Sequence, residues 1–249
     1  FGYGVTGNND FSATYMANML GSDTNWMMPN GTWAYSYGKS QNVNPNLGWE
    51  EKKEWNLGVD YSFFEGRLYG KFDYYRRKVD NLLFSVKVPQ PPYTQGSQMQ
   101  NIGSMESKGW EFEVGGDIIR TKDFTWSSSM NLSHNTGKIL TLEGDNSYHN
   151  GNGFVAPGTP GDGARMEAGS TIGSFYMWKF AGFDDEGSFL LYNKDGEVIP
   201  AAQKTENDKQ YIGNYTPKLI IGWSHTLTYK NFDLGINLRS WIDFDVYNT

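Results

Sequence analysis

The chain has 249 residues, a formal net charge of −7, 16% aromatic residues and no cysteine. The negative charge argues against a nucleic-acid partner, and the lack of cysteine excludes disulfides and thiolate metal sites within these residues. No stretch approaches the roughly 20 consecutive apolar residues that a transmembrane helix needs. Many aromatic rings in a polar chain are instead typical of β-sheets with one wet face.

Four aromatic residues stand among polar neighbours in the first fifty residues: Trp26, Trp33, Tyr35 and Tyr37. A fifth, Tyr93, follows two prolines. We expect all five in exposed loops, where a ring can stack on a sugar or hold an apolar peptide side chain. Anchoring at a membrane interface and packing within the loops are the alternatives. These five residues form the candidate substrate-binding set.

Period-two alternation, the pattern of β-strands, begins at Glu54 and continues to Ser62. A second alternating run covers residues 67–79, and the turn at 64–66 predicts a hairpin. Residues 80–108 follow. Three prolines within 89–92 forbid a central strand there, so we expect a long loop with short extended pieces at most.

Two further hairpins are predicted downstream. One joins residues 110–118 and 124–133 through a turn at 120–123, and the other joins 219–229 and 232–238 through a turn at 230–231. Between them, residues 141–216 are rich in Gly, Pro, Asn and Asp, with compact aromatic runs only at 174–180 and 188–192. We expect a long excursion carrying one or two strands.

The fold class is therefore all-β. A soluble β-sandwich shows the same alternation of apolar and polar residues, but connections that alternate between three or four residues and roughly thirty or more favour a transmembrane antiparallel β-barrel with long extracellular loops. A closed barrel pairs every backbone group within the membrane. Glu111, Glu113 and Asp117 then share the lumen side. Five tryptophans near the ends of alternating runs are expected at head-group level: Trp55, Trp110, Trp126, Trp223 and Trp241.

Residues that carry chemistry are sparse. His134, His149 and His225 share no metal-ligand or catalytic spacing, and no nucleophile-and-base constellation is present. We expect no cofactor, no metal site and no enzymatic activity. The acidic segments at 184–187 and 193–196 resemble calcium loops but lack the full ligand spacing, which favours ordinary turns. The basic run at 76–78 is either a solvated strand end or a contact for anionic lipopolysaccharide.

A series of short phrases resembles the SusC/RagA-like TonB-dependent transporters of Bacteroidetes outer membranes. Asn44-Pro45-Asn46-Leu47-Gly48-Trp49-Glu50 leads into a strand in the manner of that family, and Ile212-Gly213-Asn214-Tyr215-Thr216-Pro217-Lys218 resembles a later family phrase. Between and before them, in family order, stand Gly7-Asn8, Asp73-Tyr74-Tyr75, Asn81-Leu82-Leu83, Gln100-Asn101-Ile102-Gly103, Lys108-Gly109-Trp110 and Gly173-Ser174-Phe175-Tyr176.

The resemblance implies a multi-pass barrel of about 22 strands in the outer membrane of a Gram-negative bacterium. It implies active import of oligomeric nutrients, either glycans or oligopeptides, with a SusD-like surface lipoprotein as lid and TonB acting through an N-terminal region. Residues 1–249 would be part of the barrel domain, with the plug domain and the closing C-terminal strands absent. A passive porin-type barrel and a soluble carbohydrate-binding β-sandwich are the alternatives.

Overall fold

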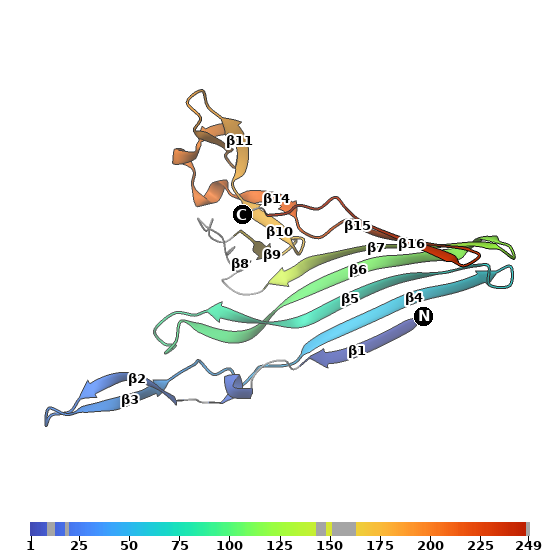
Figure 1. Ribbon diagram of the computed structural model, residues 1–249. Coiled ribbons are helices and arrows are strands. Elements are labelled where there is room, and N and C mark those ends of the chain that lie inside the picture. Colours follow the sequence, from blue (N-terminus) through green and yellow to red (C-terminus); the bar gives the residue numbers. More distant parts are fainter. Residues whose placement is uncertain (9–12, 18–19, 143–147, 151–162, 248–249) are drawn as a thin grey trace.

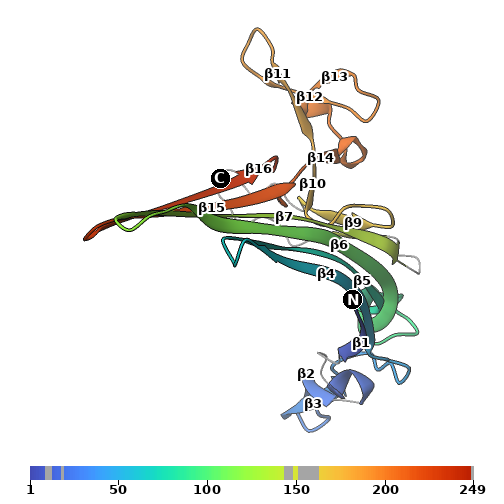
Figure 2. The same cartoon turned by 90° about the vertical axis from the view of Figure 1, so that its right-hand side faces the viewer.

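The computed structural model describes residues 1–8, 13–17, 20–142, 148–150 and 163–247. Its main feature is a seven-stranded antiparallel sheet, which we call the wall (Figure 1). In spatial order its strands are β1 (Gly2–Asn8), β4 (Glu50–Phe63), β5 (Leu68–Lys87), β6 (Ser97–Arg120), β7 (Phe124–Leu142), β15 (Leu219–Tyr229) and β16 (Phe232–Ile242). Seen along the strands, the wall forms an arc, as expected for a segment of a larger cylinder (Figure 2).

The three predicted hairpins are confirmed. β4 and β5 are joined at residues 64–67, β6 and β7 at 121–123, and β15 and β16 at 230–231. Phe64, Glu65, Gly66 and Lys230 have positive φ angles, which tight hairpin turns require. All three turns lie at one end of the wall, which we call the inner end, and the longer connections lie at the opposite, outer end (Figure 1).

The prediction of a loop over residues 80–108 is wrong. β5 continues to Lys87 and β6 starts at Ser97, so only residues 88–96 connect them, and all three prolines lie within that connection. The two strands stay paired from Leu82↔Gly103 to Lys87↔Ser97 after register shifts near Asp80. At the outer end of the wall both faces of the sheet are wet or covered by loops, so pairing continues without the alternation that marks strands in the sequence.

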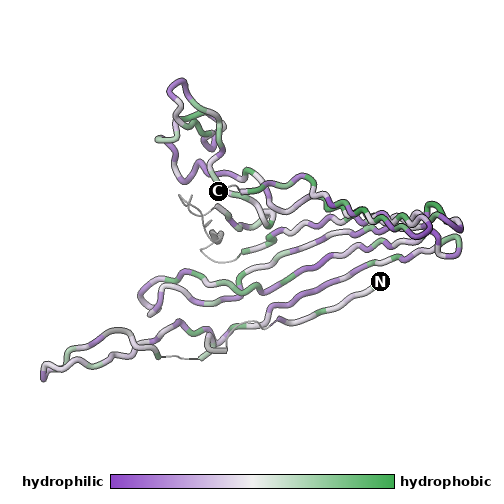
Figure 3. Tube along the Cα trace, viewed as in Figure 1, coloured by the Kyte–Doolittle hydropathy of each residue, from purple (hydrophilic) through white to green (hydrophobic). Residues whose placement is uncertain are grey.

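The wall has one apolar and one polar face. Strand register places the apolar residues on one face and the polar residues on the other. The apolar face includes Leu57, Phe72, Tyr74, Phe112, Leu132, Ile221 and Leu238. The polar face includes Asp60, Lys71, Glu111, Glu113, Asn131 and Asn237. Figure 3 shows the alternation along β15 and β16. Leu57, Val59 and Leu234 are 46%, 53% and 55% exposed. In the described part of the chain no second sheet covers this apolar face, whereas in a β-sandwich a second sheet would pack on it.

The predicted shared side for Glu111, Glu113 and Asp117 is confirmed, and Asp117 accepts a hydrogen bond from Ser127 Oγ at 2.7 Å. The head-group placement of the tryptophans stays a prediction. Trp223 lies inside β15, and Trp55 and Trp110 do not start their strands, because β4 and β6 begin before the alternating runs. Trp55 and Trp110 instead mark the height at which the apolar face gives way to charged residues.

Tyrosines cover glycines across neighbouring strands of the wall. A Cβ atom at Gly70 would collide with the Tyr61 ring, and one at Gly109 or Gly115 would collide with Tyr75 or Tyr69. A ring lying flat over a glycine shields backbone that would otherwise be bare, which offsets the weak strand propensity of glycine. The many glycines of these strands are therefore sites of close cross-strand packing.

The first excursion, residues 9–49, is more regular than expected. It contains the 3₁₀-helix η1 (Ala13–Met16) and a hairpin of β2 (Leu20–Met27) and β3 (Trp33–Lys39). The prediction that its aromatic residues lie in loops is wrong, because Trp26, Trp33, Tyr35 and Tyr37 all belong to paired strands. A two-stranded ribbon with both faces in solvent has no apolar stripe to reveal it in the sequence.

The second excursion, residues 143–218, carries more than the one or two strands predicted. Its described strands are β8 (Tyr148–Asn150), β9 (Arg165–Glu167), β10 (Ser174–Met177), β11 (Lys179–Phe183), β12 (Phe189–Tyr192), β13 (Val198–Pro200) and β14 (Gln210–Asn214), with helices η2 (Ala201–Gln203) and η3 (Glu206–Asp208). The aromatic run at 174–180 divides because β10 pairs with β14 and β11 with β12. No helix among the described residues has the length and apolarity to span a membrane.

Close packing is concentrated near the outer end. The buried apolar side chains include Leu82, Val86, Ile102, Ile139 and Leu142, at the outer ends of β5, β6 and β7. There β7 extends past β15, and its open edge pairs with the second excursion through Ile139 N to Ser170 O at 3.0 Å and Ile172 N to Gly137 O at 2.9 Å. The excursion is thus fixed to the wall.

Candidate functional site

The β2–β3 hairpin extends beyond the outer end of the wall (Figure 1). It carries a row of exposed aromatic side chains. Trp33, Tyr35 and Tyr37 alternate along β3 and so point to one side, and they are 68%, 72% and 69% exposed. We call them the aromatic row. Alternate residues on a strand lie roughly 6.6 Å apart, so the rings form an evenly spaced surface. Trp26 pairs with Ala34 and lies on the opposite side of the hairpin.

The chain that follows the hairpin is attached to the wall by asparagine side chains. Asn42 is buried, donates Nδ2 to Gln95 O at 2.6 Å and Ser97 O at 2.8 Å, and accepts from the backbone N–H of Thr94 at 3.1 Å. Asn44 donates to Met99 O at 3.0 Å. We call these contacts of Asn42 and Asn44 the asparagine clasp. An amide side chain that donates and accepts can substitute for a strand partner.

Tyr93 lies in the connection 88–96, held by the asparagine clasp through its neighbour Thr94. Tyr93 is half-buried, and its N–H donates to Pro89 O at 3.3 Å. The clasp therefore brings the Tyr93 connection close to the segment that leads out of β3. In the part of the chain that the structure describes, no hydrogen bond or ring contact joins Tyr93 to the aromatic row, so the five predicted residues do not form one compact pocket.

A polar pocket that the sequence did not reveal lies between the wall and the second excursion. Its volume is about 480 Å³, and its lining includes His134, Asn214, Lys218, Asp243 and Asp245. Asn214 accepts from Thr216 N at 2.7 Å and donates to Ile172 O at 3.0 Å. Residues 212–218 thus connect the second excursion to the wall. In the sequence, the pocket is indicated only by two acidic residues near the end of the chain, Asp243 and Asp245.

The second excursion also exposes three phenylalanines. Phe180, Phe183 and Phe189 are 51%, 60% and 58% exposed, and their ring centroids lie 5.1 to 5.9 Å apart. They surround the β11–β12 turn, where Asp184 Oδ1 accepts from Ser188 N at 2.7 Å and Gly187 has a positive φ of 81°. The segments at 184–187 and 193–196 are therefore ordinary turns, as predicted. In the sequence, this cluster could have been predicted from the phenylalanines on both sides of the acidic turn.

A network of ionisable groups joins β9, β10 and β14. Tyr211 Oη donates to Glu167 Oε1 at 3.0 Å, and Arg165 Nη1 donates to Tyr176 Oη at 2.7 Å. Burial, followed by the hydrogen bond to Glu167, raises the pKa of Tyr211 from 10.0 to about 12. The tyrosine stays neutral at physiological pH, and the network binds the short strands together.

The histidines make structural contacts. His134 Nδ1 faces Lys218 O, and His225 accepts from Trp126 Nε1 at 3.3 Å; the side chain of His149 lies outside the described residues. Among those residues, no group of three or more His, Asp or Glu side chains is arranged to hold a metal ion. The surfaces described above are suited to noncovalent binding.

Comparisons with known proteins agree with this geometry. Residues 2–248 match the family described as TonB dependent receptor-like, beta-barrel. The chain is 32% identical to the TonB-dependent receptor SusC of Bacteroides thetaiotaomicron over 99% of its own length, and 33% identical to TonB-dependent receptor P3 of Formosa agariphila over 83%. The solved RagAB peptide importer in its open-open state has a TM-score of 0.79, with 26% identity over 97% of this chain.

The aligned region covers only part of each related protein. The chain spans 25% of the SusC receptor, 22% of receptor P3 and 25% of the RagAB chain. The wall and its two excursions therefore correspond to about a quarter of a much longer barrel protein.

Proposed function

Since the chain belongs to the TonB-dependent receptor-like β-barrel family, we propose that it supplies wall and external loops to a TonB-energised importer of oligomeric nutrients. It is part of an outer-membrane β-barrel of a Gram-negative bacterium. The observation that carries the proposal is the wall itself, which has one apolar face, one polar face and turns at a single end, and which matches the RagAB peptide importer over 97% of this chain.

The remaining barrel is proposed to come from residues outside this chain. β1 and β16 are the outermost strands of the wall, and in the described residues no strand pairs with their outer edges. Unpaired backbone groups in hydrocarbon cost several kcal/mol each, so these edges require further strands. We assign the plug and the segment that TonB engages to the same missing part. The polar face of the wall, with Lys71, Glu111 and Glu113, would line the lumen around the plug.

The external excursions are the proposed site of substrate contact and of docking by a SusD-like lipoprotein lid. The aromatic row is the candidate substrate surface, because exposed rings on a paired strand are held in place and lose little freedom on binding. Tyr93, on a connection anchored by Asn42, is a second candidate, and Trp26 faces the other side of the hairpin. Either a glycan or an oligopeptide suits such rings, and the related RagAB protein is described as a peptide importer.

Energised import is the first property to test. In cells that carry the complete transporter, uptake of a labelled oligomer should stop when TonB is deleted. A passive pore would continue to admit the substrate without TonB, and that result would refute import while leaving the barrel assignment intact.

The aromatic row is tested on the purified complete transporter. Replacing Trp33, Tyr35 and Tyr37 together by alanine should weaken oligomer binding about tenfold or more in calorimetric titrations, since each anchor ring typically contributes over 1 kcal/mol. Trp26→Ala is the matched control on the opposite side of the hairpin. Equal affinities for the triple variant and the parent would remove the row from the binding surface.

A further inference from the structure

Strand β7 changes its neighbour near the outer end of the wall. Its outer edge is paired with β15 as far as Ser133, which lies opposite Ile220. Pairing of the same edge with the second excursion begins at Gly137, whose carbonyl oxygen accepts from Ile172 N at 2.9 Å. Residues 134–136 lie between these two partners, and we call this stretch of β7 the edge gap.

The backbone groups of Asn135 point into the edge gap. Alternate residues of an antiparallel strand direct their N–H and C=O groups to the same side. Gly137 O and Ile139 N both bond to the second excursion, so the groups of Asn135 face the same way. In the part of the chain that the structure describes, neither group of Asn135 has a hydrogen-bond partner on that side. An unpaired strand edge is a template for pairing with another extended chain.

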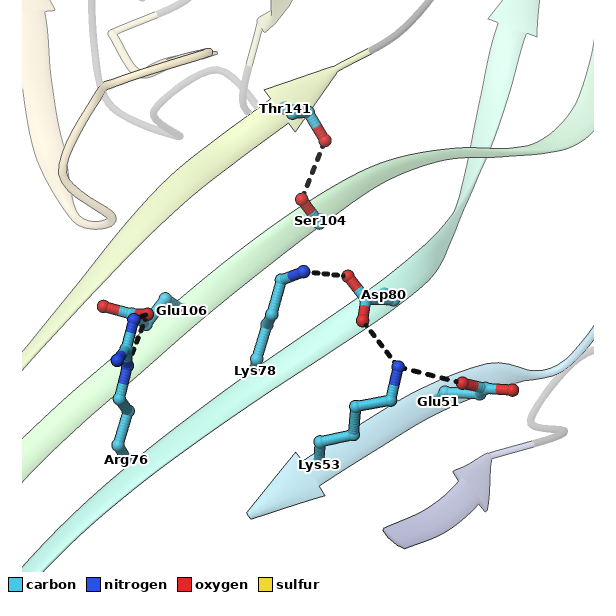
Figure 4. Close-up of polar contacts among 8 residues, drawn as sticks. All are labelled: Glu51, Lys53, Arg76, Lys78, Asp80, Ser104, Glu106 and Thr141. Atoms are coloured by element: carbon cyan, nitrogen blue, oxygen red, sulfur yellow. Dashed lines mark hydrogen bonds and ion pairs between the residues drawn. The ribbon is translucent and has the colours of Figure 1, made fainter. Parts of the chain in front are cut away.

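On its other edge β7 stays paired with β6 across the edge gap. Further out, the hydroxyl oxygens of Ser104 and Thr141 lie 2.7 Å apart and join the same two strands (Figure 4). The charged side chains nearby are engaged with one another, as where Arg76 Nε donates to Glu106 at 2.7 Å (Figure 4). The free hydrogen-bonding groups of the edge gap therefore face the second excursion, and β7 itself is held firmly in place.

The edge gap forms one side of the polar pocket between the wall and the second excursion. Residues 134–137 line that side, and Thr171 and Ile172 of the excursion line another. The pocket volume of about 480 Å³ is within the range usual for ligand sites. From Ser133 to Gly137 the strand rises about 13 Å, which leaves room for about three residues of an added extended chain.

The end of the pocket near β16 carries more acidic than basic groups. Its lining includes the carboxylates of Asp243 and Asp245 and the ammonium group of Lys218. Lys218 pairs with Asp243, whereas Asp245 is exposed and accepts from the backbone N–H of Asn214 at 2.9 Å. The excess carboxylate favours a ligand with a positive group, such as the free amino terminus of a peptide.

We propose that the edge gap binds the main chain of an oligopeptide, which adds to Asn135 as a short extra strand. The backbone N–H of Asn135 donates to a peptide carbonyl, and its C=O accepts from a peptide N–H. The amino terminus of the peptide lies beside Asp245. A glycan lacks the regular donor and acceptor spacing of a strand, so the edge favours a peptide. The site is separate from the aromatic row, and its role in import rests on the proposed function.

The test measures, by native mass spectrometry, how much of a random hexapeptide pool the purified complete transporter retains. Asn135→Pro removes the N–H that faces the edge gap and spares the β6 ladder, because proline is tolerated where its nitrogen faces away from a partner strand. This variant should retain at least fivefold less peptide. Asn135→Ala keeps the N–H and is the matched control, with an expected change of less than twofold. Both substitutions are made in protein that lacks the three rings of the aromatic row, so that peptide held there does not mask the edge gap.

A second probe is the same hexapeptide pool with N-methylated backbone amides, which cannot donate to the carbonyl oxygen of Asn135. The alanine variant should retain this pool at least fivefold less than the unmethylated one. Equal retention of the two pools would overturn the proposal, as would equal retention of peptide by the proline and alanine variants. Retention of a neutral glucan hexasaccharide that is lost in the proline variant would assign the edge gap to glycans and would also overturn the peptide assignment.

Failure of this inference is distinguishable from failure of the proposed function. If the proline and alanine variants retain peptide equally while uptake in cells still depends on TonB, the peptide site is refuted and import stands. Uptake without TonB refutes import, whereas the difference between the two variants is measured on purified protein and does not depend on TonB. An unchanged heat-modifiable electrophoretic shift in each variant verifies that the barrel has folded.

Discussion

The wall and the two excursions are both β-structure, but they are stabilised differently. In the wall, long continuous ladders hold the strands, and the identity of a side chain matters mainly through the face on which it lies. In the excursions the strands are short, and side-chain hydrogen bonds from Asn42, Asn214 and Tyr211 hold them together. The effect of a substitution in the wall should therefore depend on the face on which the side chain lies. In the excursions it should depend on the hydrogen bond that the particular side chain makes.

A charge on the apolar face should produce the largest effect. Phe112→Lys places an ammonium group on the lipid side of β6, between Phe72 and Leu132, and should cost about 2–4 kcal/mol of unfolding free energy. Glu113→Lys, on the polar face one residue away, should cost less than about 1 kcal/mol. Urea titrations of the complete protein in lipid vesicles measure both. Equal losses would show that the two faces do not differ as described.

Removal of the asparagine clasp should produce a smaller and local effect. Asn42→Ala removes the side-chain partner of backbone groups of Thr94, Gln95 and Ser97, whose hydrogen bonds to Asn42 are partly buried, at a cost of about 1–3 kcal/mol. Amide hydrogen exchange should accelerate at residues 94–95, while the wall exchanges as before. The control Asn46→Ala alters an exposed side chain. Faster exchange throughout β5 and β6 would contradict the local role of the clasp.

High pH should destabilise the second excursion but not the wall, and this effect should be the smallest of the three. The pKa of Tyr211 is raised from 10.0 to about 12, so the neutral phenol is favoured in the folded state. The stability from this group is complete below pH 10 and is lost as the pH rises through about 12. Near-ultraviolet circular dichroism should show loosening of the second excursion in that range. Tyr211→Phe should abolish this step, and its persistence in the variant would assign it to another group.

The wall was predictable from the sequence wherever its two faces meet different solvents. Trp55 to Tyr61 and Leu219 to Tyr229 alternate because one side contacts lipid and the other contacts water. The outer ends of β5 and β6 were missed because that contrast disappears above the membrane. Polar residues such as Gln98 and Asn101 there donate to backbone oxygens of the neighbouring segment 43–48, and no periodicity reveals such contacts.

The candidate binding residues were predictable as types but not as an arrangement. Aromatic rings among polar neighbours were visible in the sequence, whereas the separation of Trp26 from Trp33, Tyr35 and Tyr37 depends on the hairpin register. The Phe180 cluster and the pocket beside Asn214 depend on turns and on joints between distant segments. Such surfaces arise from tertiary pairing, which local sequence patterns do not encode.

The unequal lengths of the outer connections also bear on the order in which the wall assembles. β4, β5, β6 and β7 are consecutive neighbours closed by short links, whereas β15 reaches β7 only after residues 143–218. Compared with the link at 88–96, that closure spans roughly three doublings of length and costs about 2 kcal/mol more in chain entropy. We expect the four-stranded meander to form first and β15–β16 to join it late, as a preformed hairpin.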